Sequence, residues 1–313
     1  MDAFVFGNAT LDVICHPVDE VPRRTSISFE KSIVSPGGCG SNVAVGLSCL
    51  GVTTALVARI GSDEAGEMAR RYWERLGIDC HFVRRDPEHQ TGVSIGLVDS
   101  AFQPRFVHTS GANALLTVDD LDLLGLTAAG GRHLHIAGFY VLPGLLDGRL
   151  PFALDQARRL GLVTSLDVVE SPRMRDPELL WPCLPHLDYF LCNAHEAQRL
   201  TGEVDPSRAV HVLQAHGGKT VIIKLGEEGC LVDGILASGE QVSRRIPVPQ
   251  VEVVDTTGAG DAFAAGLIAG LLDGHDLLAA CESANAAGAK IVTELGAITA
   301  WLKKIKFQGY GTR

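Results

Sequence analysis

Short β-like runs of apolar residues alternate with longer helix-like segments along most of the chain. The strand-like runs are residues 2–7, 53–61, 133–139, 162–169, 188–193 and 220–226. The helix-like segments are residues 43–50, 63–76, 146–160, 194–200, 262–272 and 277–293. Strands that alternate with helices predict an α/β fold, in which helices cover both faces of a central, mostly parallel sheet. In such a sheet, ligands bind at the carboxyl ends of the strands.

One region interrupts this alternation. Residues 80–85, 92–99 and 105–109 form β-like runs with no helix between them, and residues 25–35 alternate in a similar way. Consecutive strands inside an alternating chain predict a separate small sheet. We expect a four-stranded lid over the substrate, built from about residues 12–36 and 80–110, within a single domain of residues 1–313.

The most informative stretch is a glycine turn near the C-terminal end. Residues 251–254 are typical of a short strand, and the turn that follows leads into an apolar helix. Such a turn leaves backbone N–H groups free at the positive end of the helix dipole, where an anion binds well. Asp261 would repel that anion, but its position makes sense if it accepts a proton from an attacking hydroxyl. We therefore predict that Asp261 is a general base and that the N–H groups of Gly258, Ala259 and Gly260 stabilise a transferring phosphoryl group.

Two other interpretations of this turn exist. Asp261 could simply cap the helix, since aspartate is a preferred N-cap residue. Gly258 and Gly260 also begin a dinucleotide-binding G-x-G-x-x-G pattern, but Phe263 occupies the third glycine position. The turn also lies far from the first βαβ unit, where that pattern belongs, so a dinucleotide site is disfavoured.

The string DTTGAGDAFAAG at residues 255–266 closely resembles the C-terminal signature of the ribokinase-like, or PfkB, family of carbohydrate kinases. The segment PGGCGSN at residues 36–42 resembles the N-terminal signature of the same family. The resemblance covers nearly the whole chain and implies a ribokinase-like three-layer sandwich. It also implies transfer of the γ-phosphoryl group of ATP to a primary hydroxyl of a small sugar. The implied cofactors are ATP and Mg²⁺, with K⁺ as a candidate third.

The resemblance further assigns roles to individual residues. Contacts to the acceptor are implied for Asp12, Gly37, Gly38 and Asn42, and contacts to ATP for Asn193, Lys224, Gly226, Gly229 and Asn285. Glu196 would organise Mg²⁺ through water, and Asp255 and Thr257 would hold K⁺. Simpler interpretations remain, because an asparagine cap and a first-turn glutamate favour a helix start by themselves. Cys39 stands where ribokinases usually carry lysine, so ribose specificity does not follow.

Composition and charge narrow the class of partner. The chain has 27 lysine and arginine residues against 37 aspartate and glutamate residues, a formal charge of −10. This charge argues against binding to nucleic acid or an anionic membrane. With no apolar run of membrane-spanning length and eight cysteines without a C-x-x-C pair, we expect a cytoplasmic protein with reduced thiols. Its expected partners are a small-molecule substrate and, through exposed lid edges, a second copy of the chain.

Two alternative functions stay open at this point. A nucleoside kinase on the same scaffold could stack the base of its acceptor on an aromatic ring, and the candidates are Phe102, Phe106, Phe139 and Tyr140. A non-catalytic sugar or nucleotide sensor is the second alternative. The presence of Asp261 argues against a sensor, because a pure binder needs no proton acceptor.

Overall fold

The computed structural model describes residues 1–236 and 238–303, so residues 304–313, the end of the predicted domain, lie outside the described residues. A nine-stranded sheet forms the centre of this part of the chain. Its spatial order is β13 (Gln241–Ile246), β12 (Cys230–Ile235), β11 (Val221–Lys224), β10 (Tyr189–Asn193), β9 (Val163–Asp167), β8 (His133–Ala137), β1 (Ala3–Gly7), β4 (Thr54–Gly61) and β5 (Val83–Asp86). Neighbouring strands from β11 to β5 are parallel. Strand β12 pairs antiparallel with both of its neighbours, β11 and β13. The predicted, mostly parallel sheet is confirmed.

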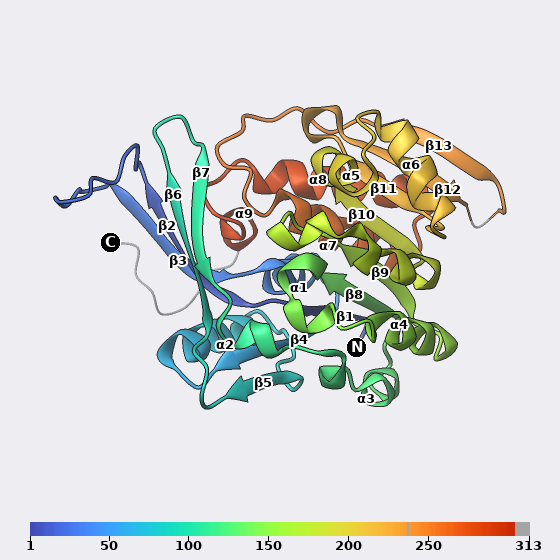
Figure 1. Ribbon diagram of the computed structural model, residues 1–313, viewed down its shortest axis with the longest axis horizontal. Coiled ribbons are helices and arrows are strands. Elements are labelled where there is room, and N and C mark those ends of the chain that lie inside the picture. The colour runs from blue at the N-terminus through green and yellow to red at the C-terminus, as the bar shows by residue number, and fades with distance from the viewer. Residues whose placement is uncertain (237, 304–313) are drawn as a thin grey trace.

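Helices cover both faces of this sheet, as Figure 1 shows. One face packs against α1 (Cys39–Cys49), α2 (Glu64–Arg75), α7 (Ala259–Leu272), α8 (Leu277–Ile291) and α9 (Thr299–Leu302). The other face packs against α3 (Leu123–Ala128), α4 (Leu150–Arg159), α5 (Ala194–Thr201) and α6 (Pro206–Ala215). The result is the three-layer sandwich expected from the sequence. No helix within the described residues is both long and apolar enough to cross a membrane.

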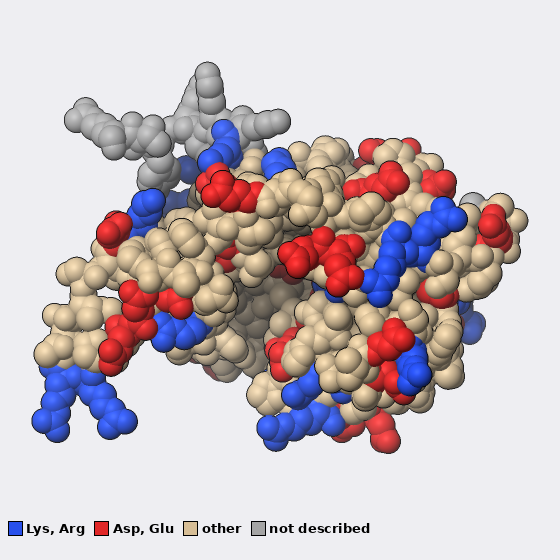
Figure 2. Space-filling model, turned by 90° about the horizontal axis from the view of Figure 1, so that it is seen from above, with Lys and Arg blue, Asp and Glu red and all other residues tan. Residues whose placement is uncertain are grey.

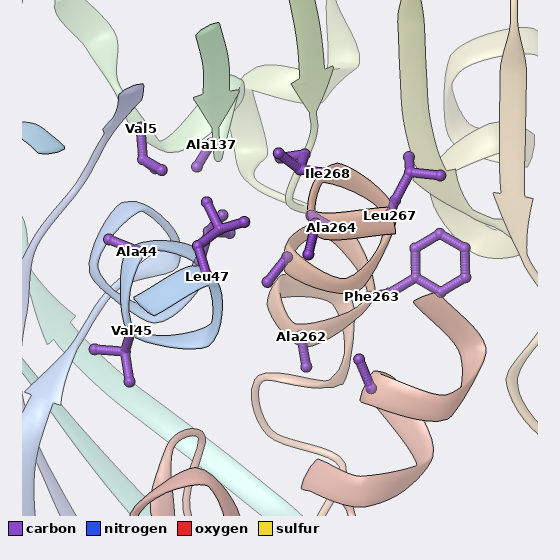
Figure 3. Close-up of a cluster of buried hydrophobic side chains, with 14 of the residues drawn as sticks. Val5, Ala44, Val45, Leu47, Ala137, Ala262, Phe263, Ala264, Leu267 and Ile268 are labelled. Carbon is purple, nitrogen blue, oxygen red and sulfur yellow. The ribbon is translucent and has the colours of Figure 1, made fainter. Parts of the chain in front are cut away.

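Helix α7 is held tightly between the sheet, α1 and α8, as the buried side chains in Figure 3 show. A Cβ at Gly46 of α1 would lie 2.7 Å from the Cβ of Ala265, and one at Gly266 would lie 2.7 Å from the Cβ of Ala287 in α8. The helices therefore approach as closely as glycine allows. Burying a side chain such as Leu267 stabilises the fold by roughly 1.5–3 kcal/mol. This packing fixes the position of the first turn of α7, which carries Asp261.

A second, four-stranded sheet projects from the large sheet at the left of Figure 1. Its order is β3 (Lys31–Gly37), β2 (Thr10–His16), β6 (Gly92–Val98) and β7 (Pro104–Thr109). The predicted small sheet thus exists, but one of its strands was assigned wrongly. Residues 80–85 contribute β5, which pairs with β4 in the large sheet, and the fourth strand of the small sheet is β2. Strand β2 pairs along its length with β3 on one side and β6 on the other, so its backbone hydrogen bonds belong to the small sheet.

The strand predicted at residues 251–254 was wrong. These residues adopt no regular structure, although Val251 and Val253 favour strands. Pro247 and Pro249 lie just before them and cannot donate to a sheet, which helps to end the pairing of β13 at Ile246. The segment instead runs along a cavity, with Val251 39% and Val253 57% exposed.

Candidate active site

Two adjoining cavities lie at the carboxyl ends of the parallel strands. One, of about 610 Å³, lies between the small sheet and the large sheet, and we call it the acceptor cavity. The other, of about 470 Å³, lies beside α7 and α8, and we call it the nucleotide cavity. Both are lined by Asn193, Lys224, Thr256 and Gly260, so the two cavities meet at these residues. Figure 2 shows the surface hollowed between the small sheet, at the left, and the rest of the molecule.

The glycine turn before α7 has the geometry of an anion site. Gly258 is the N-cap with a φ of 77°, and a Cβ there would lie 2.6 Å from the Cβ of Ala297. Among the described residues, no hydrogen-bond acceptor faces the N–H groups of Gly258 and Gly260. Ala259 differs from the prediction, because its N–H donates to the carbonyl of Thr256 at 3.2 Å. Two of the three predicted amides are therefore free to bind an anion.

Asp261 lies in the first turn of α7 and not at its N-cap, so the simple capping interpretation is wrong. Its side chain lines the acceptor cavity, and its Oδ2 accepts a hydrogen bond from Asn42 Nδ2 at 2.8 Å. Burial, followed by the negative charge of Asp167, raises the pKa of Asp261 from 3.8 to about 7. A carboxylate with that pKa can accept a proton near neutral pH and keep it.

Asp12 projects from β2 into the same cavity. Thr10 Oγ1 donates to Asp12 Oδ1 at 2.6 Å, and burial raises the pKa of Asp12 to about 6. The carboxyl group packs directly against the backbone of Gly37, where a Cβ would lie 2.0 Å from Asp12 Cγ. Only glycine leaves room for Asp12 at this point. Gly38, with a φ of 85°, continues the same turn into α1 and lines the cavity.

Asn42 shows a specific unfilled requirement. The residue is 6% exposed and lines the acceptor cavity. Its amide nitrogen donates to Asp261, but its Oδ1 is buried and finds no donor among the described residues. A buried acceptor without a partner costs about 1–3 kcal/mol. A hydroxyl group bound in the cavity would satisfy it.

The polar residues shared by the two cavities form a charged cluster. Asn193 and Glu196 make a reciprocal capping box at the start of α5. The backbone N–H of Asn193 donates to Glu196 Oε2 at 2.7 Å, and the backbone N–H of Glu196 donates to Asn193 Oδ1 at 2.8 Å. Burial raises the pKa of Glu196, against the opposing charge of Lys224. Burial alone would lower the pKa of Lys224, but the carboxylates of Glu196 and Asp167 outweigh it and raise that pKa. Lys224 is thus a cation at the junction, and a Cβ at Gly260 would lie 3.0 Å from its Nζ.

The nucleotide cavity is mostly apolar away from this junction. Its walls include Val248, Val251, Phe263 and Val292. Gly226 and Gly229 line it, both with positive φ, and a Cβ at Gly229 would lie 2.0 Å from the carbonyl oxygen of Ile246. Asn285 also lines the cavity, but its amide donates to the carbonyls of Ile246 and Pro247 at 2.9 and 3.2 Å. It therefore holds the wall of the cavity in place.

Asp255 is buried beneath the glycine turn, 1% exposed. Its Oδ1 accepts from the N–H and the hydroxyl of Thr257 at 2.9 and 2.7 Å, and its Oδ2 accepts from the N–H of Gly296 at 2.8 Å. Within the described residues, no cationic side chain pairs with this carboxylate. Thr257 itself lines the acceptor cavity.

Several residues that line the acceptor cavity were not selected from the sequence. They include Asn8, Ser94 and Asp167. Asp167 had a usable signal, because it is the polar last residue of an apolar strand, as Asn193 and Lys224 are. Ser94 had none, since its place in the cavity depends on how the small sheet folds over the large one.

A carboxyl group with a raised pKa beside a helix start with free N–H groups, between two cavities of an α/β sandwich, is an arrangement suited to phosphoryl transfer. The pfkB family carbohydrate kinase model matches residues 2–304. The chain belongs to this family, and it is an ATP-dependent phosphotransferase of the kind that acts on sugars or nucleosides.

Individual relatives support the same assignment. Aminoimidazole riboside kinase from Salmonella typhimurium is 31% identical over 95% of this chain and 91% of its own length. Ribokinase from Mus musculus is 32% identical over 84% of this chain and 79% of its own length. A solved structure of a putative ribokinase II from E. coli, in complex with ATP and Mg²⁺, matches with a TM-score of 0.80 at 25% identity, covering 95% of this chain and 94% of that one.

Proposed function

We propose that this protein transfers the γ-phosphoryl group of ATP to a primary hydroxyl of a small sugar. The observation that carries the proposal is the position of Asp261, at the start of α7 where the two cavities meet. A hydroxyl in the acceptor cavity and a phosphate at the glycine turn would approach each other beside this carboxylate. Phosphoryl transfer needs mainly positioning and charge stabilisation, so catalysis would occur where the two cavities meet.

Asp261 would take the proton of the attacking hydroxyl. The amide of Asn42 orients its carboxylate, and the raised pKa lets it hold the proton after transfer. A positioned base of this kind contributes about 10²–10⁴-fold to the rate. The N–H groups of Gly258 and Gly260 would meanwhile bind the negative charge that develops on the phosphoryl oxygens.

The acceptor would be held by its hydroxyl groups. Asn42 Oδ1 offers a buried acceptor, and Asp12 offers a carboxylate that Thr10 holds in one orientation. Such groups distinguish a hydroxyl-rich ligand from an apolar one, because an unmatched buried polar group is costly. The small sheet would act as a lid that excludes water from the transferring phosphoryl group.

ATP would lie with its base among the apolar walls of the nucleotide cavity and its phosphates toward the glycine turn and Lys224. The donor set also fits Mg²⁺, which binds oxygen ligands and usually keeps several waters while bridging one or two carboxylates to phosphate. Glu196 and Asp167 line the acceptor cavity near its junction with the nucleotide cavity, and together with Asn193 they would hold the ion through water. The ion would neutralise charge on the phosphates.

We also propose K⁺ near Asp255 and Thr257. The support is a buried carboxylate whose hydrogen-bond donors, among residues 1–236 and 238–303, are the neutral N–H and O–H groups of Thr257 and the N–H of Gly296. Replacing KCl by choline chloride at constant ionic strength should lower kcat in the wild type, and Asp255→Asn should remove the difference. Equal rates in both salts would contradict this assignment.

A nucleoside acceptor is the second candidate, and one aromatic residue favours it. Of the four rings considered, Phe139 and Tyr140 are buried in the core, and Phe102 stacks on His16 at the far end of the lid. Phe106 alone lines the acceptor cavity, 41% exposed, where it could stack on a base. One of the relatives is named aminoimidazole riboside kinase, which supports a nucleoside acceptor as the second candidate.

An ADP-release assay with ribose, fructose, 2-keto-3-deoxygluconate and adenosine as acceptors separates the candidates. Turnover on a sugar that Asp261→Asn abolishes would support the proposal. Turnover only on adenosine, lost in Phe106→Ala, would favour the nucleoside kinase. ATP binding without turnover on any acceptor would favour a non-catalytic sensor.

A second copy of the chain remains the proposed protein partner, through the outer face of the small sheet. Val34, Val13, Ile95 and Val107 lie in one row across this face by strand register, and Val34, Ile95 and Val107 are 43%, 40% and 65% exposed. An apolar row of this kind favours association with another surface. Light scattering should give twice the mass of one chain for the wild type and a lower mass for Val107→Lys.

A further inference from the structure

The chain crosses between the large sheet and the small sheet four times within the described residues, at residues 8–9, 38, 87–91 and 110. These crossings are closely packed. A Cβ at Gly38 would lie 3.1 Å from the Cα of Ala9, and one at Gly92 would lie 2.6 Å from Asn113 Nδ2. We call the region where they meet, residues 8–10, 38, 90–92 and 110–113, the joint. The small sheet extends away from the large one at this joint (Figure 1).

Ala9 lies in the joint and belongs to neither sheet ladder. Pairing of β1 ends at Gly7, and pairing of β2 begins at Thr10. Ala9 is fully buried, so its backbone N–H and carbonyl need partners within the protein. Asn113 supplies both, because its Oδ1 accepts from the N–H of Ala9 at 2.9 Å and its Nδ2 donates to the carbonyl of Ala9 at 2.8 Å. One side-chain amide thus takes the place of a neighbouring strand.

The backbone of Asn113 belongs to the part of the chain that packs on the large sheet. Asn113 lies in a short helical turn, residues 111–115, and its carbonyl accepts from the N–H of Leu116 at 3.2 Å. Leu116 is fully buried in the cluster that contains Phe4 of β1 and Val57 of β4. Asn113 is itself only 2% exposed. Its side chain therefore ties the start of β2 to the large sheet.

The joint decides where Asp12 lies relative to the rest of the active site. Asp12 is the third residue after Ala9 and lines the acceptor cavity from β2, whereas Asn42 and Asp261 line it from α1 and α7. Asn42 and Asp261 are hydrogen-bonded to each other, but among the described residues no hydrogen bond links Asp12 to either of them. The position of Asp12 relative to these two residues thus depends on how the small sheet is joined to the large one.

We propose that Asn113 is a positioning residue that holds the joint so that Asp12 and Asn42 bind the same acceptor molecule. This role rests on the proposed kinase function. A loosened joint would let Asp12 move with the small sheet, which would weaken acceptor binding and open the cavity to water. Water would then take part of the phosphoryl groups and give ADP and free phosphate.

The test compares the wild type with Asn113→Leu, which has a side chain of similar volume but no hydrogen-bonding group. ADP and phosphorylated acceptor are measured in the same samples, with the acceptor that the ADP-release assay identifies. The wild type should form both in a ratio of about one, whereas the variant should release at least about twice as much ADP as phosphorylated acceptor. Its KM for the acceptor should rise at least about tenfold, and its KM for ATP should change less than about twofold.

Thr164→Val is the matched control, because Thr164 also joins two backbone groups from a buried position. Its hydroxyl donates to the carbonyl of His186 at 2.8 Å and accepts from the N–H of Asp188 at 3.3 Å, and Thr164 lines neither cavity. This variant should lose stability but keep the wild-type product ratio and both KM values. If Asn113→Leu fails to fold, Asn113→Asp takes its place. It keeps an acceptor for the N–H of Ala9 but puts an oxygen against the carbonyl, so the changes should have the same direction.

Amide hydrogen exchange of the unliganded protein tests the joint itself. In Asn113→Leu, the peptide that contains β2 should exchange at least about tenfold faster than in the wild type, because the unpaired groups of Ala9 favour local opening. The peptide that contains β11, in the large sheet, should exchange at the wild-type rate. In Thr164→Val, β2 should also exchange at the wild-type rate.

Wild-type exchange of β2 in the Asn113 variant that folds would overturn the proposal. Faster exchange with an acceptor KM or a product ratio that stays at the wild-type value would overturn it as well, because the joint would then not position Asp12. If the wild type phosphorylates no acceptor, the proposed function fails, and the exchange of β2 still decides whether Asn113 holds the joint.

Discussion

Asp261 should make the unliganded protein less stable at neutral pH, and Asp261→Asn exposes this cost. The folded protein holds a proton on Asp261 up to a pKa of about 7, whereas the unfolded chain releases it above 3.8. The native state therefore binds more protons between these values, and stability falls as the pH rises through this window. The full difference is 7 − 3.8, or about 3 pH units, which corresponds to about 4 kcal/mol at 1.36 kcal/mol per unit. Because the side chain is partly open to the acceptor cavity, we expect about half of this, ~2 kcal/mol.

The assay is chemical unfolding of the wild type and Asp261→Asn at pH 5, 6, 7 and 8 without ligands. Asparagine does not titrate, so the variant should be more stable, by an amount that grows from pH 5 to about pH 7 and is constant above it. The same variant should lose about 10²–10⁴-fold in kcat. Gains in stability and losses in activity from one substitution would show that this carboxylate is placed for catalysis at the expense of the fold.

Asp63→Asn is a control of opposite sign. Asp63 caps α2 and accepts hydrogen bonds from Gly66 and Thr91, which lower its pKa despite burial. It stabilises the fold above its unfolded pKa, so its replacement should destabilise by a constant amount from pH 5 to pH 8. A stability difference for Asp261→Asn that is equally constant over this range, or of the opposite sign, would refute the assigned pKa.

Three further predictions address the ligands. Gly37→Ala should raise the KM for the acceptor at least about tenfold with little change in the KM for ATP, because the new Cβ would lie 2.0 Å from Asp12 Cγ; equal changes in both constants in initial-rate kinetics would argue against separate cavities. Glu196→Gln should raise the Mg²⁺ concentration for half-maximal rate about 10–100-fold, whereas Glu170→Gln, an exposed carboxylate on the same cavity, should not. Metal-free binding of a non-hydrolysable ATP analogue, measured by calorimetry, should weaken from pH 6 to pH 8 more in the wild type than in Asp261→Asn; equal pH dependence would show that Asp261 does not face the phosphates.

Local chemistry explains most of what the sequence could predict. The alternation of strands and helices follows from short-range periodicity. The glycines at residues 255–261 are enough to predict a turn into a helix with free N–H groups. Asp12 and Asn42 were also found, through the family resemblance. Their meeting with Asp261 was not visible, because the hydrogen bond from Asn42 to Asp261 joins residues 219 positions apart. That contact depends on the packing of α1 against α7.

The errors occurred where tertiary pairing overrides local preference. Val251 and Val253 favour a strand by composition, but they lie along a cavity after two prolines. Residues 80–85 alternate as a lid strand would, yet β5 pairs with β4. A strand pattern shows that a segment can pair, and it does not show which edge it will pair with.

Burial and neighbouring charges act together on the carboxyl groups that line the acceptor cavity, and most of these groups lie outside the glycine turn. Four carboxyl groups line the acceptor cavity, those of Asp12, Asp167, Glu196 and Asp261. Lys224 lines it as well, and its raised pKa keeps it a cation. Burial raises the pKa of Asp12 to about 6, and burial followed by the negative charge of Asp167 raises the pKa of Asp261 to about 7. The carboxyl oxygens of Asp167 are held in place, with His135 Nε2 3.3 Å from Oδ2 and the N–H of Gly138 donating to Oδ1 at 2.6 Å. A glycine turn alone would bind phosphate without accepting a proton. The raised pKa that would let Asp261 act as a base near neutral pH comes first from burial and then from the negative charge of Asp167 on β9, with a smaller contribution from Asp12 on β2.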